Sequence, residues 1–249
     1  MGEQTMLTGA KVADKNGGLV AVLGAMDEEV ALIAGGLEEA RHDSAGARAG
    51  LDVVHGRLPK KDGGSIEVVA TVGGMGTVNI ASATQYLIDA YGPEAVIFSG
   101  IAGNLNKDLH INDVVLGGTL RYLDSDMRLI AQSAPRTEDF HSDPHLLRLA
   151  EQALTDMGIT HKTGTIATGN YFVDSPQAVA RVKEETGADA VEMEGAAVCH
   201  VAARNQVPAL VIRALSDNAD TDYEVFKAFD ISEYADTAAR LVLAIAAGV

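Results

Sequence analysis

The chain has 249 residues, 47% of them hydrophobic, and its 19 Lys and Arg against 35 Asp and Glu give a formal net charge of −16. Such a composition is typical of a folded α/β domain that buries a sizeable core, and it argues against intrinsic disorder. The acidic balance without a basic cluster disfavours nucleic acid and anionic membranes as partners, and the single cysteine, Cys199, excludes an intrachain disulfide.

The first 18 residues contain no long apolar run, and no later window approaches the roughly 18 consecutive apolar residues that a membrane-spanning helix needs. We therefore expect a flexible segment over residues 1–18 and one domain over residues 19–249. A lone cysteine also fits a reducing compartment, so the sequence predicts a soluble, cytoplasmic protein.

From residue 19 onward, short apolar runs alternate with longer segments of helical period, which is the pattern of βαβ units around a mixed or parallel sheet. In the first half of the chain, strands are expected at residues 19–23, 51–58, 66–72, 95–99 and 114–117. Helices are expected to begin at Asp27, where acidic residues suit the first turn, and after Gly76. Glycine-rich turns at residues 73–76 and 100–103 either supply positive φ or let backbone amides approach a ligand closely.

Residues 121–143 are polar and aperiodic and exceed the usual length of a connection, which predicts a functional cover or a partly disordered segment. The rest of the chain is expected to hold helices at 144–157, 177–185, after 194 and at 232–247, and strands at 163–168, 188–194 and 209–215. Together these elements predict an α/β fold: a single-domain, three-layer α/β/α structure with a central mixed sheet.

Three carboxylates stand at or just past the ends of apolar strands, where open α/β sheets place their ligand crevices: Glu29, Glu194 and Asp217. An acid at such an edge can be desolvated enough to hold a proton at neutral pH, which makes Asp217 a candidate general acid. Each acid also has an ordinary structural interpretation, since Asp217 can turn the chain, Glu29 can stabilise the first turn of a helix and Glu194 can cap one. Position alone leaves both interpretations open.

Glu192 and Glu194 lie two residues apart, so they share one side of the chain if it is extended, and either could bind a ligand hydroxyl. A divalent cation is a weaker proposal, because His200 and the other histidines show no ligand spacing around this pair. Residues 74–79 break the dinucleotide fingerprint at its third glycine, which argues against a nicotinamide cofactor. Cys199 and His200 are interpreted as structural.

Four segments in the same order resemble the nucleoside phosphorylase and nucleosidase superfamily, most closely its 5'-methylthioadenosine/S-adenosylhomocysteine nucleosidase branch. They are VAVLGAMDEEV at 20–30, FSGIAG at 98–103, VEMEG at 191–195 and RALSD at 213–217. The similarity covers about residues 19–247 and implies a nucleoside phosphorylase-like fold. It also implies hydrolysis of the N-glycosidic bond of 5'-methylthioadenosine and/or S-adenosylhomocysteine to adenine and the 5'-thio-substituted ribose. A small-molecule adenine nucleoside as ligand, no cofactor, a homodimer and a role in methionine salvage follow from the same resemblance.

The resemblance assigns roles to particular residues. Glu29 matches the acid that holds and activates water, and Arg213 resembles an arginine near that water. Asp217 matches the aspartate that protonates the purine on its N7 side, where negative charge develops as the base leaves. The residues implied for substrate binding are Glu194 at the ribose hydroxyls, Met193 on the sugar, Phe172 stacked on the base, Val173 at the base edge, and Ala102, Gly103 and Ser216.

Phosphorolysis is the main rival, because phosphorylases of this superfamily share the fold and the Met-Glu and Ser-Asp elements. Phosphate needs positive charge or a strong nest of amides, yet residues 24–29 and 100–103 contain no arginine and Lys107 is the only nearby base. Glu29 would repel phosphate, so hydrolysis is preferred. A silent nucleoside-binding protein and a dinucleotide-dependent oxidoreductase are the alternatives from other classes.

Two departures from the family pattern concern the substrate. Ile101 stands where many relatives carry a small hydroxyl residue, next to the expected water site. Residues 121–143 keep Tyr122 and the acids Asp124 and Asp126 but otherwise diverge from the family segment that contacts the 5' substituent and a second subunit. The sequence therefore leaves the substrate open among methylthioadenosine, S-adenosylhomocysteine, 5'-deoxyadenosine and a futalosine-like nucleoside.

Overall fold

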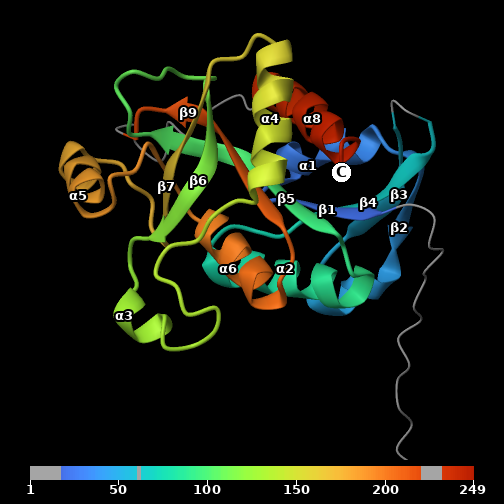
Figure 1. Cartoon of the computed structure of the whole chain (residues 1–249), viewed down its shortest axis with the longest axis horizontal. Coiled ribbons are helices and arrows are strands. Elements are labelled where there is room, and N and C mark those ends of the chain that lie inside the picture. Colours follow the sequence, from blue (N-terminus) through green and yellow to red (C-terminus); the bar gives the residue numbers. More distant parts are fainter. Residues whose placement is uncertain (1–17, 61–62, 220–231) are drawn as a thin grey trace, which may run out of the picture.

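The computed structural model describes residues 18–60, 63–219 and 232–249, which form a mixed sheet with helices on both faces (Figure 1). The predicted α/β class and the three-layer arrangement around a central mixed sheet are therefore confirmed. The flexible segment expected over residues 1–18 lies, apart from Gly18, outside the described residues. None of the helices in the described part of the chain combines the length and the apolar character that a membrane crossing requires.

Nine strands of the described residues join in one sheet, in the order β2-β3-β4-β1-β5-β8-β7-β6-β9. Their bounds are β1 Leu19–Gly24, β2 Glu38–Asp43, β3 Val53–Pro59, β4 Ser65–Val72, β5 Ala95–Asn104, β6 Val114–Tyr122, β7 His161–Thr168, β8 Ala190–Glu192 and β9 Ala209–Asp217. Strand β1 runs parallel to β4 and β5, and β5 runs parallel to β9. The carboxyl ends of β1, β5 and β9 therefore meet at one edge of the sheet.

The sheet closes on itself beyond β5. This strand pairs with β9 along most of its length and with β8 at Gly103 and Asn104. Strand β9 pairs in turn with β6, β6 with β7, and β7 with β8, so these five strands form a ring. Strands β1, β4, β3 and β2 continue from β5 as an open sheet. The sequence does not predict this closure, because it depends on pairings between segments far apart in the chain.

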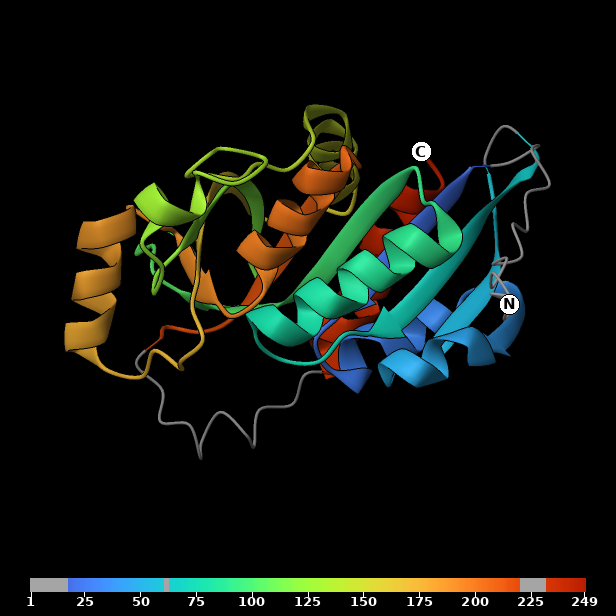
Figure 2. The same cartoon turned by 90° about the horizontal axis from the view of Figure 1, so that it is seen from below.

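Helices cover both faces of the sheet. Their bounds are α1 Asp27–Gly35, α2 Thr77–Tyr91, α3 Met127–Ile130, α4 Pro144–Asp156, α5 Pro176–Thr186, α6 Gly195–Asn205 and α8 Ser232–Ala246, with a 3-10 helix at Ser44–Ala49. Helices α1, α4 and α8 lie together on one face, and α2 and α6 lie side by side on the other (Figures 1 and 2). Alternate residues of β1 supply the two cores, Val20 and Val22 toward α1 and Ala21 and Leu23 toward α2.

The structure differs most from the predicted strand bounds in three places. Strand β5 continues through residues 100–103, so the glycine turn predicted there is extended strand. Strand β6 reaches Tyr122, and only Ala190–Glu192 of the predicted strand 188–194 pairs as a strand. Strand β2 was not predicted, because its sequence EEARHD is mostly exposed and lacks the alternation that marks a half-buried strand.

Residues 121–143 fold against the body of the protein. The segment starts with the end of β6, contains α3 and returns to β6 through a bridge between Leu120 and Phe140. The ring of Phe140 stacks on His200 of α6, with 4.5 Å between the centroids. The aperiodic sequence therefore occupies a fixed place beside α6, because one apolar ring anchors it there.

Candidate active site

The carboxyl ends of β1, β5 and β9 border a cavity of about 250 Å³, in the position where α/β sheets bind ligands. All ten residues to which the sequence analysis gave a role line this cavity: Glu29, Ala102, Gly103, Phe172, Val173, Met193, Glu194, Arg213, Ser216 and Asp217. The fold thus brings five separate parts of the chain to one place, which makes the cavity the candidate active site.

Glu29 lies in the first turn of α1, directly after β1, and its side chain is buried. Its Oε2 accepts the backbone N–H groups of Ala25 at 2.6 Å and Met26 at 3.1 Å, and its Oε1 accepts that of Ile101 at 3.1 Å. Burial raises the pKa of this carboxyl, while Arg213 and the three N–H groups oppose the increase. A carboxylate has about four acceptor positions, so the donors among the described residues leave one position of Glu29 open.

Arg213, in β9, is the one cation that lines the cavity among the described residues, and it is 1% exposed. Its Cζ lies 4.1 Å from the centroid of the Phe98 ring, and its Nη2 donates to Glu192 and Glu194. A Cβ on Gly100 would overlap Nη1 of this guanidinium. Gly100 therefore serves close approach rather than a turn, because it leaves room for a buried cation against β5.

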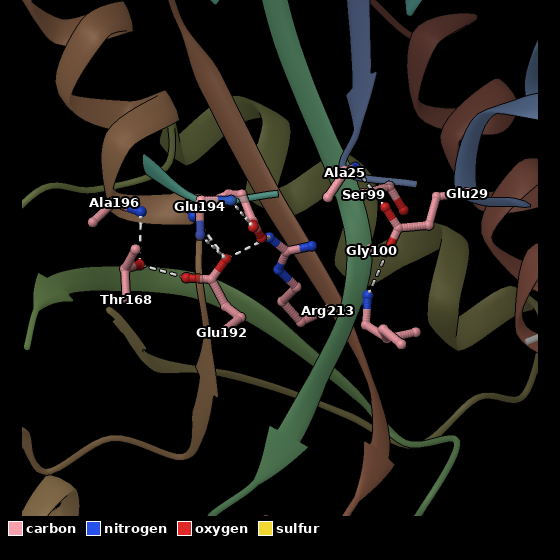
Figure 3. A network of polar contacts seen from close by, with 12 residues as sticks. Ala25, Glu29, Ser99, Gly100, Thr168, Glu192, Glu194, Ala196 and Arg213 are labelled. Atoms are coloured by element: carbon pink, nitrogen blue, oxygen red, sulfur yellow. Dashed lines mark hydrogen bonds and ion pairs between the residues drawn. The ribbon is translucent and has the colours of Figure 1, made fainter. Parts of the chain in front are cut away.

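Glu192 and Glu194 both point toward Arg213, as Figure 3 shows. Oε1 of Glu192 accepts a hydrogen bond from Oγ1 of Thr168, and its Oε2 accepts those of Arg213 and of two backbone N–H groups. These groups belong to Glu194 at 3.0 Å and Gly195 at 2.7 Å, at the start of α6. Four donors contact Glu192, three of them at Oε2, so the main role of this acid is to cap a helix and hold Arg213.

Glu194 differs, because its side chain does not cap its own helix. Its Oε1 accepts the backbone N–H of Gly76, at the start of α2, at 2.7 Å, and its Oε2 lies 3.3 Å from Nη2 of Arg213. Two of its about four acceptor positions stay open to the cavity with respect to the described donors. Burial and the neighbouring Glu192 raise the pKa of Glu194 to about 7, against the opposing effects of Arg213 and Gly76.

We refer to Glu29, Glu192, Glu194 and Arg213 as the inner cluster. It places three carboxyl groups around one permanent cation, so negative charge exceeds positive charge when all three are ionised. Arg213 already lies where a cation would balance Glu192 and Glu194. Across the described ranges, no three His, Cys, Asp or Glu side chains are arranged to hold a metal ion.

Asp217 is the last residue of β9, and it lies opposite Gly103 of β5. Its Oδ1 accepts the backbone N–H of Ala219 at 2.6 Å, and its Oδ2 lies 2.7 Å from the hydroxyl of Ser216. That hydroxyl is also 3.2 Å from the carbonyl oxygen of Ala102. Asp217 therefore both shapes the chain after β9 and reaches the cavity, so the two interpretations of this residue do not exclude each other.

Seven further residues complete the lining of the cavity: Ala25, Met26, Met75, Ile101, Tyr171, Val191 and Glu192. Sequence reasoning missed Met75 and Tyr171, which are 57% and 40% exposed. Neither side chain belongs to a periodic apolar pattern, so their only signal is position: Met75 lies within a glycine-rich turn and Tyr171 precedes Phe172. They add apolar surface to a pocket whose inner end is charged.

Asn170, which the sequence analysis also missed, connects three segments beside Met75 and Tyr171. Its Oδ1 accepts hydrogen bonds from the backbone N–H of Thr77 at 3.0 Å and from the Thr77 hydroxyl at 2.9 Å. Its backbone N–H and Nδ2 donate to Oδ2 of Asp124 at 2.9 and 3.2 Å. We refer to Thr77, Asp124 and Asn170 as the rim cluster. It joins the first turn of α2, the segment after β6 and the loop after β7.

Comparison with known proteins identifies the family. A family model described as the phosphorylase superfamily matches residues 19–247. The 5'-methylthioadenosine/S-adenosylhomocysteine nucleosidase of Shewanella pealeana is 35% identical over 221 residues, which cover 86% of this chain and 91% of that protein. The chain belongs to this nucleosidase family. The resemblance carried by the four sequence segments is thereby confirmed.

Solved structures of the nucleosidase family and its neighbours have the same fold. The S-adenosylhomocysteine nucleosidase of Streptococcus pyogenes, in complex with 5-methylthiotubericidin, matches with a TM-score of 0.84 and 27% identity, covering 95% of this chain and 99% of that one. The futalosine hydrolase of Helicobacter pylori matches with a TM-score of 0.82 and 30% identity, covering 93% and 98% of the two chains. The nucleoside phosphorylase-like fold is confirmed. The second match is to a hydrolase of another nucleoside, one of the alternatives named from the sequence.

Proposed function

We propose that this protein is an N-glycosidic hydrolase that cleaves 5'-methylthioadenosine and/or S-adenosylhomocysteine to adenine and the 5'-thio-substituted ribose. The observation that carries the assignment of roles is the count of open acceptor positions in the cavity. Glu29 keeps one such position, which suits a single water molecule, and Glu194 keeps two, which suits the two ribose hydroxyls. Glu192 already accepts hydrogen bonds from four donors among the described residues, so we assign it to holding Arg213 and the start of α6 rather than to binding substrate.

The proposed reaction forms a bond from water to C1' of the ribose as the bond from C1' to the purine nitrogen breaks. Glu29 accepts a proton from the attacking water, and Asp217 donates a proton to N7 of the departing adenine. Positive charge develops on the ribose ring during this step, and the negative excess of the inner cluster stabilises it. Phe172 would stack on the base, with Val173 at its edge and Met193 against the sugar.

Hydrolysis is favoured over phosphorolysis because the cavity offers phosphate no free cation among the described residues. Arg213 is the one cation in the part of the lining that the structure describes, and its Nη2 already donates to two glutamates. A phosphate dianion placed beside Glu29 and Glu194 would meet repulsion from both carboxylates. Water carries no net charge, so the two carboxylates do not repel it.

The same charge distribution favours a neutral 5' substituent over an anionic one. The lining contributes Met26, Met75 and Tyr171 as apolar surface, whereas Arg213 is engaged with the inner cluster. An anionic group on the 5' side of the nucleoside would find no ion pair in the described lining. We therefore place methylthioadenosine, whose 5' substituent is neutral, first.

The deciding experiment is a chromatographic assay of adenine release from methylthioadenosine and S-adenosylhomocysteine, with and without phosphate, that separates free sugar from sugar phosphate. We expect adenine and free alkylthioribose without phosphate. A requirement for phosphate would assign the protein to the phosphorylases. Release of base only from 5'-deoxyadenosine or a futalosine-like nucleoside would change the substrate, and no release from any of them would indicate a silent binding protein.

The setting of this reaction is part of the proposal. We infer that the protein acts in the cytoplasm as a homodimer and serves methionine salvage, because the family resemblance implies this assembly and use. Light scattering on a gel-filtration column measures the assembly directly, and a single monomer peak at micromolar concentration would contradict it.

A further inference from the structure

Tyr234 of α8 contacts β5, the strand whose Ile101 N–H donates to Glu29. The contact lies on the face of the sheet opposite α2 and α6. Its ring is buried among the residues that join α8 to the sheet, and its hydroxyl donates to the carbonyl oxygen of Gly100 at 2.6 Å. The Ser99 hydroxyl lies 3.0 Å from the same Tyr234 oxygen. Because the phenolic proton is directed at Gly100, Ser99 is the donor in this second hydrogen bond.

The carbonyl of Gly100 and the N–H of Ile101 belong to one peptide unit. The carbonyl accepts from Tyr234, and the N–H donates to Oε1 of Glu29. A peptide unit is planar, so holding its oxygen also fixes the direction of its N–H. A continuous chain of hydrogen bonds therefore runs from Ser99 through Tyr234 and the peptide to Glu29, and Figure 3 shows Ser99, Gly100 and Glu29 gathered at this point.

We propose that Tyr234 is a positioning residue for Glu29, acting through the Gly100–Ile101 peptide. Hydrogen bonds in such a chain polarise one another, so the Tyr234 hydroxyl strengthens the N–H donor that holds the carboxylate. A phenylalanine would fill the same space without burying a hydroxyl, so packing of α8 does not by itself call for a tyrosine. The inference rests on the role proposed for Glu29.

The first test is Tyr234→Phe, which removes only the hydroxyl. We expect kcat to fall about 3- to 10-fold, the effect of one lost hydrogen bond of about 1 kcal/mol, with KM changed by less than about 2-fold. A weaker donor favours the charged form of Glu29 less, so the acidic limb of the kcat profile moves upward by roughly half a pH unit to one unit. Ser99→Ala, which removes the outer donor, should shift the limb in the same direction by less.

The matched control is Tyr91→Phe. Tyr91 also donates from a partly buried ring, to Asp43 at 2.9 Å, but it lies in α2 away from the cavity lining. Its variant should keep the pH profile of the wild type. The titratable groups that act on Glu29 from the packed elements are Arg213, Glu194 and Tyr234, and only the last is changed in the test variant.

Amide hydrogen exchange gives a readout that does not depend on turnover. In Tyr234→Phe, the N–H of Ile101 should exchange at least several-fold faster than in the wild type, with core amides such as that of Val22 unchanged. In a Glu29→Gln background, Tyr234→Phe should lower kcat no further, because the two residues act as one unit.

A lower melting temperature of Tyr234→Phe with an unchanged pH profile and unchanged Ile101 exchange would make Tyr234 a purely structural residue and overturn the proposal. The proposed function fails separately, when the wild type releases no adenine, and the exchange of Ile101 still decides the positioning role in that case. If Tyr234→Phe does not fold, Ser99→Ala decides by the same two readouts.

Discussion

The inner cluster lines the cavity, whereas the rim cluster lies close in the chain to two residues of its lining, Met75 and Tyr171, and the two clusters are held by different kinds of contact. Glu29 and Glu194 are buried, and backbone N–H groups and one buried cation hold them. In the rim cluster, Asn170 and Asp124 are exposed, and the contacts between them and Thr77 all depend on side chains. Water competes for the rim contacts and not for the inner ones.

Because of this difference, a substitution in the inner cluster should affect neighbouring residues more than a substitution in the rim cluster does. A buried carboxylate that loses a partner keeps its desolvation cost, and its neighbours share the consequence through Arg213. An exposed amide that loses a partner is solvated instead, at a cost below about 1 kcal/mol. We therefore expect changes at the inner end of the cavity to alter turnover by orders of magnitude, and changes at the rim to alter substrate binding a few-fold.

The largest effect is expected from Asp217→Asn. The substitution keeps the shape of the side chain and an acceptor for the N–H of Ala219, so the fold should persist, but it removes the proton donor. We expect kcat for adenine release to fall by about 10²- to 10⁴-fold, the range of a lost general acid. Circular dichroism and thermal melting check the fold. Turnover at the wild-type rate would remove Asp217 from the mechanism.

Gly100→Ala should come next, because it tests how tightly the inner cluster is packed. The new Cβ would overlap Nη1 of Arg213 and lie 2.6 Å from Oε1 of Glu29, so at least one of the two side chains must move. We expect a loss of about 1–3 kcal/mol in the free energy of unfolding and more than about 10-fold in kcat.

Gly35→Ala is the matched control for this glycine. A Cβ at Gly35, in α1, meets no atom of the described residues within 4 Å, and alanine is preferred in a helix by about 0.5–1 kcal/mol. This variant should therefore be as stable as the wild type or more stable, and fully active. If urea denaturation gave the two variants the same free energy of unfolding, the space beside Gly100 in β5 would be larger than the structure shows, which would contradict the prediction.

Glu194→Gln probes the charge of the inner cluster through pH. The pKa of Glu194 is raised from 4.5 to about 7 in the folded protein, so the native state holds this proton more firmly than the unfolded state does. The free energy of unfolding of the wild type therefore falls as the pH rises from about 4.5 through about 7. In Glu194→Gln, the fall in this free energy over the same pH range should be smaller by about 1–3 kcal/mol.

Urea denaturation at several pH values measures how the free energy of unfolding changes with pH. Glu184→Gln, on the exposed face of α5, is the control and should show the same pH dependence as the wild type. The same Glu194 variant should bind the nucleoside more weakly, because one ribose acceptor becomes a donor. A wild-type slope in Glu194→Gln would mean that Glu194 is ionised across the whole window, contrary to its burial.

The smallest effect is expected at the rim, from Asn170→Asp. The new carboxylate could still accept from Thr77, but it would lose the Nδ2 donor and face the carboxylate of Asp124. We expect KM to rise about 3-fold with kcat nearly unchanged, in line with an exposed polar contact. Steady-state kinetics measures both parameters, and the repulsion between the two carboxylates is the reason for the higher KM.

Exchanging the two groups gives the matched control for the rim. In Asn170→Asp combined with Asp124→Asn, an amide again faces a carboxylate, so KM should return toward the wild-type value. Failure of the double variant to recover would show that the rim cluster does not position the loop after β7. A fall of about 100-fold or more in kcat from Asn170→Asp alone would erase the distinction between the rim and the inner end.

Several strands, helices and candidate residues could be predicted from short stretches of the sequence. The apolar run at residues 19–23 marks β1, and the acids from Asp27 to Glu29 mark the first turn of α1. Glu194 and Asp217 could be singled out because they stand beside strand ends. Short-range patterns of this kind indicate strands, helices and candidate residues, since they depend only on neighbours in the chain.

Other parts could not be read locally. The residues 100–103 predict a turn by composition, yet β5 runs through them, because Gly100 makes room for Arg213, which is more than a hundred residues away. The choice between Glu192 and Glu194 likewise depended on Thr168, Gly76 and Arg213, which no spacing in the sequence relates.

The sequence by itself determined most of the strands and helices, the family, and ten of the residues that line the cavity. The tertiary structure decided which donors reach their oxygens: it brought four donors to Glu192, fewer to Glu29 and Glu194, and placed Tyr234 behind the peptide that holds Glu29. The physical reason is that an acceptor is occupied by whatever donor folding brings within about 3 Å of it, and that donor generally comes from a distant part of the chain.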